Sequence, residues 1–324
     1  MYTFKQIQEI VEQNIKRIPL DKEPKGLYEP IRYILSIGGK RIRPALVLVA
    51  YNLYKDNIED IIQPALALEV FHNFTLLHDD IMDKADIRRN QPTVHKKWSE
   101  NVAILSGDAM TIKAYELIAE TKPQFLPAVL KVFNKTALGV CEGQQYDMDF
   151  ETRLDVSEKE YLEMIRLKTS VLIAASLQIG ALLAEAPEND VQNIYDFGIN
   201  LGLAFQLQDD YLDSFGDVKI FGKKIGNDIL SNKKTFLLIN ALKNADKDTY
   251  EQLIRLIEKK EYGPEEKIKS VLEIYKKTKA DDLLKEKMAF YYEKAIKSLN
   301  SLSVEKDKTQ ILYDFAEKMM YRQK

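Results

Sequence analysis

The sequence predicts an all-α protein, and three observations support this fold class. Apolar residues recur at helical spacing along most of the chain. No segment shows the sustained apolar and polar alternation of a half-buried strand, and few Asn-Gly or Asp-Gly pairs mark hairpins. Most of the ten prolines fall between the periodic segments. We therefore expect ten or more helices. Because no low-complexity linker interrupts them, we expect a single domain over residues 1–324.

The first expected helix lies near the N-terminus. Apolar residues recur at helical spacing, with lysines and glutamates between them: Ile7, Ile10, Val11, Ile15 and Ile18. This pattern predicts an amphipathic helix and not a signal peptide.

The most apolar stretch runs from Val171 to Ala184 and is interrupted by Ser176, Gln178 and Gly180. No uninterrupted apolar run approaches the roughly 18 residues that cross a membrane. The stretch therefore predicts a buried core helix, and we expect no integral membrane span.

Bulk composition excludes several function classes. The net charge of −3 does not favour nucleic acid as a partner. The single cysteine, Cys141, excludes an internal disulfide and predicts a reducing compartment, so we expect the cytoplasm. Together with His72, His78 and His95 it shows no zinc-ligand spacing.

Two helical segments carry the same acidic pattern, Asp-Asp-x-x-Asp. Residues four apart share one face of a helix, and a carboxylate cluster on an apolar face is costly unless a cation joins it. Carboxylate oxygens suit Mg²⁺, which usually binds one or two carboxylates together with substrate phosphates. We therefore predict one site on two facing helices that holds a polyphosphate between them. Its expected metal ligands are Asp79, Asp80 and Asp83 in the first box, and Asp209, Asp210 and Asp213 in the second.

A third aspartate pair, Asp281-Asp282, serves as an internal comparison. It begins like the two boxes but ends in Lys285, which would repel a cation. We expect it on a solvated helix surface.

Cationic residues accompany both boxes. The segment Gly38-Gly39-Lys40-Arg41-Ile42-Arg43-Pro44 places three cations beside a turn, and Arg88-Arg89 follows the first box. Lys223, in the Gly-rich segment 222–228, and Lys233 follow the second box. Arginine offers a fork of donors to phosphate oxygens, while lysine acts as a point charge. Their recurrence next to both boxes favours an anionic substrate.

From about Gly38 to Thr235 the chain resembles the isoprenyl diphosphate synthases, trans-prenyltransferases of the polyprenyl synthase family. The resemblance rests on several motifs in fixed order. They are Gly38-Gly39-Lys40-Arg41-x-Arg43-Pro44, the first box with Arg88-Arg89 and Pro92-Thr93-x-His95, Gly143-Gln144-x-x-Asp147, Lys168-Thr169, Phe205-Gln206 with the second box, and Gly222-Lys223-x-x-Gly226-x-Asp228.

The resemblance implies an orthogonal helical bundle around a deep central cavity, and a homodimer. It implies condensation of isopentenyl diphosphate with an allylic diphosphate at a site with three Mg²⁺ ions. It also assigns residues to each substrate. Lys40, Arg43, His72 and Arg89 match the isopentenyl diphosphate pocket, and Arg88, Lys168, Lys223 and Lys233 match cations on the allylic diphosphate. Thr169 and Gln206 match groups near the departing oxygen, and the box aspartates match the Mg²⁺ ligands.

One position departs from the family pattern. Asn90 stands where the family usually has glycine after the arginine pair. Asparagine tolerates the left-handed conformation better than most residues, so we expect the loop to be retained.

Product length is expected to depend on the residues one turn before the first box. Phe74 lies five residues before Asp79, Thr75 lies four before it, and Phe71 lies one turn deeper. An aromatic ring at the fifth position predicts a floor to the product tunnel. We expect a C15 to C20 product, with C20 slightly favoured because Thr75 is small.

Two alternatives remain at this point. A class I terpene cyclase also ionises a diphosphate, and the segment 227–235 resembles its second metal motif, but the final ligand position is Thr235 instead of glutamate. The other alternative is a non-catalytic subunit of a heteromeric synthase. Such subunits tend to lose one or both boxes, whereas both are intact here.

Overall fold

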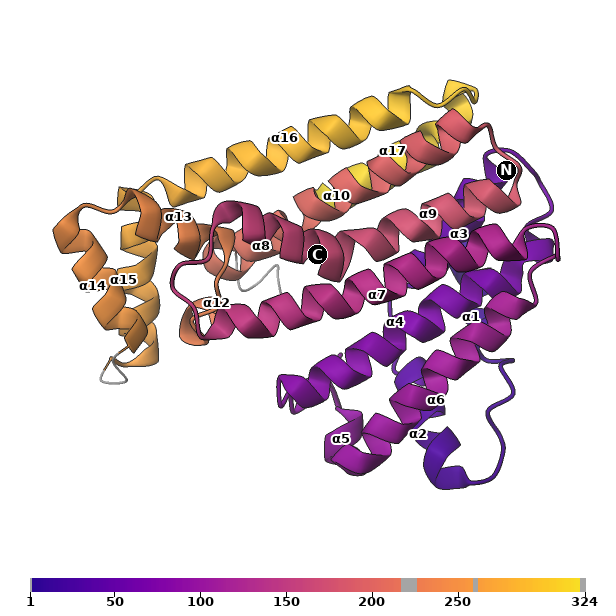
Figure 1. Ribbon diagram of the computed structural model, residues 1–324, viewed down its shortest axis with the longest axis horizontal. Helices are drawn as coiled ribbons and strands as arrows, with labels where there is room; N and C mark the ends of the chain where they lie inside the picture. Colours follow the sequence, from indigo (N-terminus) through magenta and orange to yellow (C-terminus); the bar gives the residue numbers. More distant parts are fainter. Residues whose placement is uncertain (1, 217–225, 259–261, 321–324) are drawn as a thin grey trace. The chain divides into compact units, whose positions relative to one another are not determined.

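A computed structural model describes residues 2–216, 226–258 and 262–320 of the chain. These residues are almost entirely helical, which confirms the predicted all-α class (Figure 1). The elements in chain order are α1 (Phe4–Ile15), α2 (Lys25–Ser36), α3 (Ile42–Asn52), the 3₁₀ turn η1 (Ile58–Ile61), α4 (Ile62–Met82), β1 (Ile87–Arg88), β2 (Gln91–Pro92), α5 (Val94–Lys97), α6 (Glu100–Ala119), α7 (Leu126–Glu151), α8 (Glu158–Ile165), the π-helical turn η2 (Arg166–Ser170), α9 (Val171–Leu183), α10 (Glu188–Phe215), α12 (Asn227–Leu230), α13 (Phe236–Asn244), α14 (Lys247–Glu258), α15 (Pro264–Lys277), α16 (Ala280–Asn300) and α17 (Lys306–Met320).

The chain forms two compact units. The first comprises Met1–Asn134, Ala175–Ile194 and Ser303–Ile311, and the second comprises Lys135–Ala174, Tyr195–Leu302 and Leu312–Lys324. The first acidic box lies in the first unit, and the second box lies in the second unit.

In the first unit, α4 packs along α6 and also contacts α3 (Figure 1). The predicted N-terminal helix forms and buries Ile7, Val11 and Ile15, whereas Ile10 is only partly buried and Ile18 lies beyond the end of the helix. Thr3 begins this helix in a capping box with Gln6, which satisfies backbone N–H groups of the first turn.

A short hairpin is the only strand pair in the part of the chain that the structure describes. It pairs Ile87 with Pro92 and Arg88 with Gln91. Its two turn residues, Arg89 and Asn90, have φ angles of 51° and 60°. Two-residue hairpins favour such turns because their twist matches that of the strands. Asn90 therefore takes the left-handed conformation expected of it.

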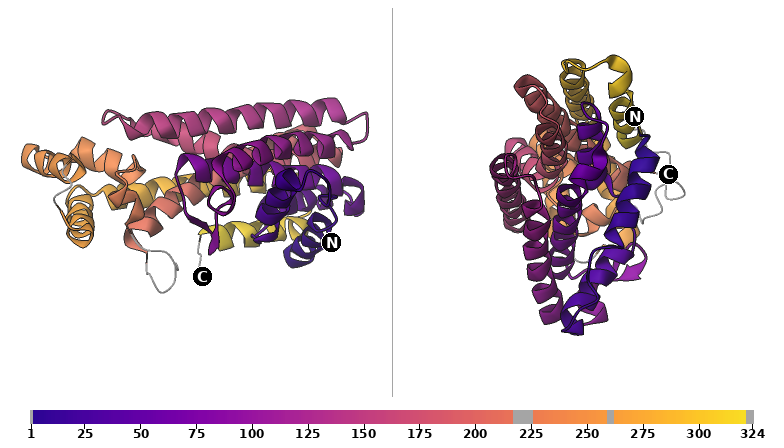
Figure 2. Two further views of the ribbon diagram at one scale, coloured as in Figure 1. Left: turned by 90° about the horizontal axis from the view of Figure 1, so that it is seen from below. Right: turned by 90° about the vertical axis from the view of Figure 1, so that its right-hand side faces the viewer.

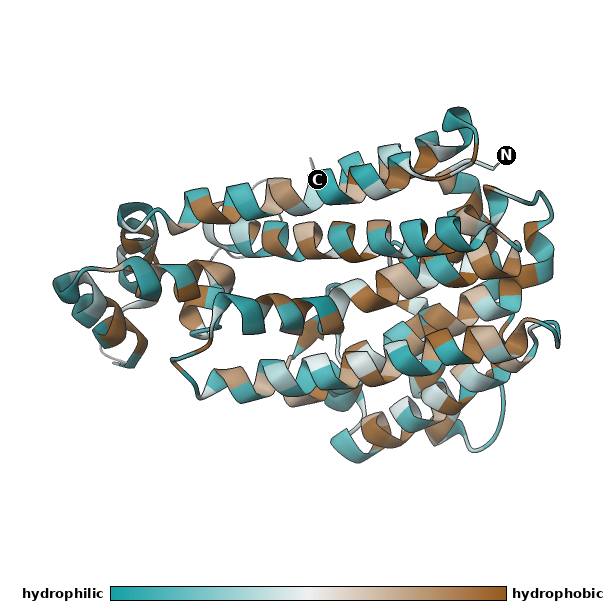
Figure 3. Cartoon of the chain, turned by 45° about the horizontal axis from the view of Figure 1, so that its top comes forward, coloured by the Kyte–Doolittle hydropathy of each residue, from teal (hydrophilic) through white to brown (hydrophobic). Residues whose placement is uncertain are grey.

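The second unit has its own apolar core. Helix α13 packs against α8 and α16, and α15 contacts α12, α14 and α16. Figures 1 and 2 show α14 and α15 side by side in orange. Tyr161, Phe150 and Phe236 are among the largest side chains fully buried in this core. Figure 3 shows apolar and polar residues interspersed along the helices, as in helices that bury one face.

One segment among the described residues, Glu158–Leu183, is long and apolar enough to cross a membrane by length and composition. However, 72 % of its most apolar window is buried inside the protein. Its apolar character is therefore explained by packing, as predicted for the stretch from Val171 to Ala184.

Candidate functional site

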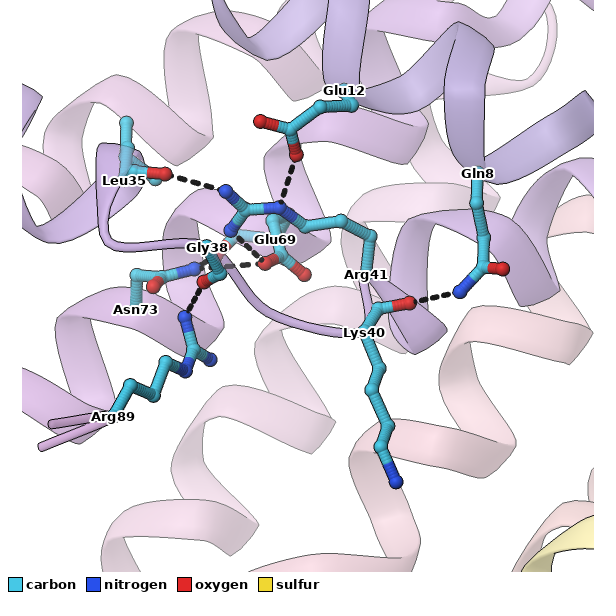
Figure 4. Close-up of polar contacts among 9 residues, drawn as sticks. All are labelled: Gln8, Glu12, Leu35, Gly38, Lys40, Arg41, Glu69, Asn73 and Arg89. Atoms are coloured by element: carbon cyan, nitrogen blue, oxygen red, sulfur yellow. Dashed lines mark hydrogen bonds and ion pairs between the residues drawn. The ribbon is translucent and has the colours of Figure 1, made fainter. Parts of the chain in front are cut away.

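The first group of predicted site residues lies around the loop of residues 38–43. Gly38, Gly39 and Arg41 all have positive φ angles, of 84°, 145° and 46°. An Arg89 side-chain N–H donates to the Gly38 carbonyl oxygen (Figure 4). The φ of Gly39 is one that residues with a Cβ rarely adopt, so glycine is favoured here, and a Cβ at this position would also lie 2.8 Å from the Arg89 guanidinium. The structure thus brings the loop and the hairpin together.

Positive charge accumulates around His72 in this unit. Burial lowers the pKa of His72 well below its usual value of 6.5, and Arg43, Arg89, Arg88 and Arg41 lower it further. The imidazole is therefore neutral among four guanidinium groups. Such an excess of cations fits an anionic ligand with several phosphate oxygens.

Arg43 is the most perturbed of these cations. Burial lowers its pKa to about 10, although the Glu69 carboxylate opposes this effect, and the neighbouring Arg89 adds to it. Its Nε atom is buried and makes no hydrogen bond within the described chain. Lys40 is exposed, and Figure 4 shows its side chain extending away from the Arg41 guanidinium.

The first acidic box occupies the C-terminal end of α4. Its last turn contains no basic residue, and Asp83 is the C-cap. Carboxylates at this negative end of the helix dipole are unfavourable unless a cation is nearby. Arg88 supplies one, because its Nε lies 2.9 Å from both carboxylate oxygens of Asp80, and its Nη2 lies 3.8 Å from Asp79. Asp80 is buried, whereas Asp83 is exposed.

Aromatic side chains line α4 before this box. The Phe74 ring centroid lies 5.4 Å from that of Phe71 and 4.8 Å from that of His78. Phe71 in turn contacts Phe133 of α7, which contacts Tyr115 of α6, at 5.2 and 5.1 Å. The predicted floor residues therefore belong to a larger aromatic cluster.

His78, to which no role was assigned, packs against α6. Its Nε2 lies 3.1 Å from the Ile104 carbonyl oxygen, and a Cβ at Gly107 would lie 2.2 Å from the same nitrogen. We therefore assign His78 to the α4–α6 packing.

In the second unit, the predicted catalytic pair Lys168-Thr169 lies in the π-helical turn η2. Such turns are rare and occur frequently at functional sites. Lys168 forms an ion pair with Asp147 at 2.6 Å, and the Thr169 hydroxyl donates to Gln206 Oε1 at 3.2 Å. A Cβ at Gly143 would lie 2.4 Å from the Lys168 backbone nitrogen, so this glycine permits the close approach of α7.

The second acidic box lies near the C-terminal end of α10, whose last turn also lacks basic residues. Asp210 is buried and accepts hydrogen bonds from the Tyr161 hydroxyl and, at 3.5 Å, from the Phe236 N–H. Burial raises its pKa to about 7, and the nearby Asp228 carboxylate adds to this effect. Asp210 therefore joins α8 and α13 to α10.

Two further carboxylates surround this box, and neither was among the predicted site residues. Asp228 donates its backbone N–H to Asp213 Oδ2 at 3.0 Å. Burial raises the pKa of the Asp228 carboxyl to about 6, Lys233 opposes this, and Asp213, Asp147 and Asp209 raise it further. Burial alone would also raise the pKa of Asp147, but Lys233 and Lys168 lower it below its usual value. Asp147 and Asp228 each end one of the sequence motifs shared with the isoprenyl diphosphate synthases. These motifs could have identified both as site residues.

These donors fit Mg²⁺. Carboxylates crowd the negative end of α4, others crowd the negative end of α10, and each group favours a divalent cation with oxygen ligands. Among the described residues, no three His, Cys, Asp or Glu side chains form a group that could hold an ion by themselves. Mg²⁺ usually needs fewer, since it binds one or two carboxylates together with substrate phosphates. Lys223 was also predicted to hold the diphosphate, but it lies outside the described residues.

Comparison with known proteins agrees with this arrangement. Residues 24–275 match the family model for polyprenyl synthetase. The chain is 44 % identical over 273 residues to a short chain isoprenyl diphosphate synthase of Methanocaldococcus jannaschii, covering 84 % of this chain and 82 % of that protein. It is 39 % identical over 310 residues to a geranylgeranyl diphosphate synthase of Sulfolobus acidocaldarius, covering 94 % and 92 %.

Solved structures give the same result. A crystal structure of a geranylgeranyl pyrophosphate synthase superposes with a TM-score of 0.94 at 45 % identity, over 100 % of both chains. A second such enzyme, from Corynebacterium glutamicum in complex with isoprenyl diphosphate and magnesium, has a TM-score of 0.88 at 26 % identity, covering 99 % of this chain and 100 % of that one. With its cation-rich loop, its two acidic boxes and a matching family model over most of its length, this chain belongs to the polyprenyl synthetase family.

Proposed function

We propose that the chain is a prenyltransferase that condenses isopentenyl diphosphate with an allylic diphosphate, head to tail. The product is a short-chain all-trans prenyl diphosphate, and inorganic diphosphate is released. The observation that carries this proposal is that the arginines around His72 have different carboxylate partners. Arg88 pairs with Asp80 of the first acidic box, whereas Glu69, outside the box, is the main carboxylate acting on Arg43 and Arg89. One anion site with metal ligands and one without suit two different diphosphate substrates.

The proposed reaction has three steps. The allylic C–O bond breaks, and its electron pair leaves with the diphosphate. The double bond of isopentenyl diphosphate then attacks the allylic carbocation and forms the new C–C bond. Finally a proton leaves the condensed cation, and the released diphosphate is the proposed base.

The proposed cationic residues divide into two groups by the substrate that each holds. Lys40, Arg43, His72 and Arg89 hold isopentenyl diphosphate, whereas Arg88, Lys168, Lys223 and Lys233 neutralise the departing allylic diphosphate. Thr169 and Gln206 bond to each other beside Lys168, where they can orient the leaving oxygen. Charge stabilisation of a leaving group in a water-poor site is usually the largest catalytic term.

The acidic boxes are the proposed metal sites, with three Mg²⁺ ions held by Asp79, Asp80, Asp83, Asp209, Asp210 and Asp213 together with the allylic diphosphate. When bound, Mg²⁺ supplies Lewis-acid neutralisation of the diphosphate charge. We further propose a homodimer in the cytoplasm, and the single cysteine supports this compartment.

The proposed product is C15 to C20, with C20 favoured. Support comes from the small Thr75 beside Phe74, and from relatives that are named geranylgeranyl diphosphate synthases.

The cyclase alternative is disfavoured by the segment 227–235. The Thr235 side chain caps α13 by accepting from the Leu238 N–H, and the Ser231 hydroxyl donates to the Asn227 carbonyl oxygen. Two of the positions that a cyclase would use as metal ligands are thus engaged with the backbone.

A product assay tests the proposal. Purified protein is incubated with radiolabelled isopentenyl diphosphate, Mg²⁺ and, in parallel, dimethylallyl, geranyl or farnesyl diphosphate. We expect an elongated prenyl diphosphate. A cyclised hydrocarbon would indicate a terpene cyclase, and an absence of reaction would indicate a non-catalytic subunit.

A further inference from the structure

We propose that Arg41 and Glu69 are positioning residues that hold the loop of residues 38–43 in the conformation that binds isopentenyl diphosphate. This inference rests on the proposed function. Neither residue is assigned to contact the substrate; they act through Lys40, Arg43 and Arg89.

The backbone of this loop needs external support. Arg41 precedes α3 with a φ of 46°, and no side-chain hydrogen bond caps this helix. The left-handed conformation is unfavourable for a residue with a side chain, because Cβ approaches the following carbonyl oxygen. Conformations of this kind persist only when the surrounding structure imposes them, and they cluster at ligand-binding sites.

The Arg41 side chain provides that support in three directions (Figure 4). It donates to Glu12 Oε2 of α1 at 2.9 Å, to Glu69 Oε1 of α4 at 2.8 Å, and to the Leu35 carbonyl oxygen of α2. The Arg41 and Glu69 side chains are only 2 % and 3 % exposed. Burial alone would lower the pKa of Arg41, but Glu69 and Glu12 raise it above its usual value. The buried guanidinium therefore joins three helices to the loop.

Glu69 is also the anion that faces the substrate-binding arginines. Its charge opposes the pKa depression of both Arg43 and Arg89. The Asn73 side-chain amide donates to the same Oε1 atom at 3.0 Å and fixes its orientation. Glu69 thus holds together a cluster of like charges that would otherwise repel one another.

The two proposed positioning residues lie next to the residues they serve. Lys40 precedes Arg41 directly, and its carbonyl oxygen accepts a hydrogen bond from Gln8 of α1. Arg43 follows two residues later, and Arg89 binds the Gly38 carbonyl oxygen. A shift of the Arg41 side chain would therefore displace three proposed contacts to one substrate and none assigned to the other.

The test is steady-state kinetics of Glu69→Gln, which keeps the shape of the side chain and removes its charge. Misplacement by about 1 Å can cost about a hundredfold, so we expect the KM for isopentenyl diphosphate to rise about tenfold or more. The KM for the allylic diphosphate and kcat at saturating isopentenyl diphosphate should change less than about twofold. Calorimetric titration of the protein with isopentenyl diphosphate alone should show the same loss of affinity without any turnover.

Asp190→Asn is the matched control. Asp190 is 2 % exposed, like Glu69, and accepts hydrogen bonds from the Tyr54 hydroxyl and from Ser303. This variant should lose thermal stability without a change in either KM. The inference is overturned if Glu69→Gln leaves the KM and the calorimetric affinity unchanged, or if Asp190→Asn raises the same KM equally.

Two further experiments separate the positioning role of Glu69 from a folding defect and from failure of the proposed function. If Glu69→Gln does not fold, Glu12→Gln is the second variant, because it weakens only the ion pair between Arg41 and the partly exposed Glu12. It should raise the KM for isopentenyl diphosphate by a smaller factor. An unchanged KM in that variant would also overturn the inference. Wild-type protein that forms no elongated product would overturn the proposed function, while the calorimetric titration would still test the role of Glu69.

Discussion

The two acidic boxes share one sequence pattern, yet their surroundings differ. Both lie near the C-terminal end of a long helix, and both bury their middle aspartate. Asp80 is held by the Arg88 guanidinium, whereas Asp210 is held by a hydroxyl and a backbone N–H. The first box lies among arginines, whereas the second lies among further carboxylates and two lysines. The shared pattern places carboxylates at both sites, and the surrounding residues determine the partners of each carboxylate.

The largest expected effect comes from removing an outer carboxylate of either box. Asp79→Asn and Asp213→Asn should each lower kcat about a thousandfold, because each would weaken neutralisation of the leaving diphosphate. The assay is product formation at saturating substrates. Asp282→Asn is the matched control, since Asp282 is exposed and lies 3.5 Å from Lys285. A kcat within tenfold of wild type in either box variant would contradict the proposed role of that aspartate as a metal ligand.

Arg88→Met should remove the ion pair that holds Asp80 of the first box and should leave the second box unaffected. It leaves the buried Asp80 without its cation, and breaking a buried ion pair costs about 3 kcal/mol. The measurement is the free energy of unfolding in urea. Arg153→Met is the comparison, because its partners Asp155 and Glu160 are exposed, and it should cost less than about 1 kcal/mol. Equal losses in the two variants would show that Arg88 does not support Asp80.

Tyr161→Phe should remove the hydrogen bond from the Tyr161 hydroxyl to Asp210 of the second box, and should lower the free energy of unfolding by less than Arg88→Met does. It removes one neutral donor from the buried Asp210, which costs about 1–2 kcal/mol of unfolding free energy. Tyr115→Phe, whose hydroxyl donates to an exposed asparagine, should cost less than about 0.5 kcal/mol. If Tyr161→Phe and Arg88→Met lower the free energy of unfolding equally, a charged partner does not stabilise its buried aspartate more than a neutral partner does.

The last contrast concerns product length and not rate or stability. Phe74→Ala should lengthen the product by at least one isoprene unit, because it removes the expected floor before the first box. The second box has a phenylalanine in a similar place, Phe205, four residues before Asp209. Phe205→Ala should leave the product unchanged by chromatography. An unchanged product in Phe74→Ala would exclude Phe74 as the floor, and a longer product in Phe205→Ala would remove the distinction between the boxes.

Much of the molecule could be predicted from local patterns. The N-terminal helix, the buried apolar helix from Val171 and the left-handed Asn90 all follow from periodicity or from conformational preference over a few residues. Such features depend on neighbours in sequence, so the sequence contains what is needed to predict them.

The sequence by itself determined that carboxylates and cations recur in a fixed order, and this order indicated the family. Only the tertiary structure decided which of them meet. It paired Arg41 with Glu69 across 28 residues, Lys168 with Asp147 across 21, and Asp210 with Tyr161 across 49. The physical reason is that a buried charge must find a partner, and the partner is chosen by how helices pack and not by distance along the chain.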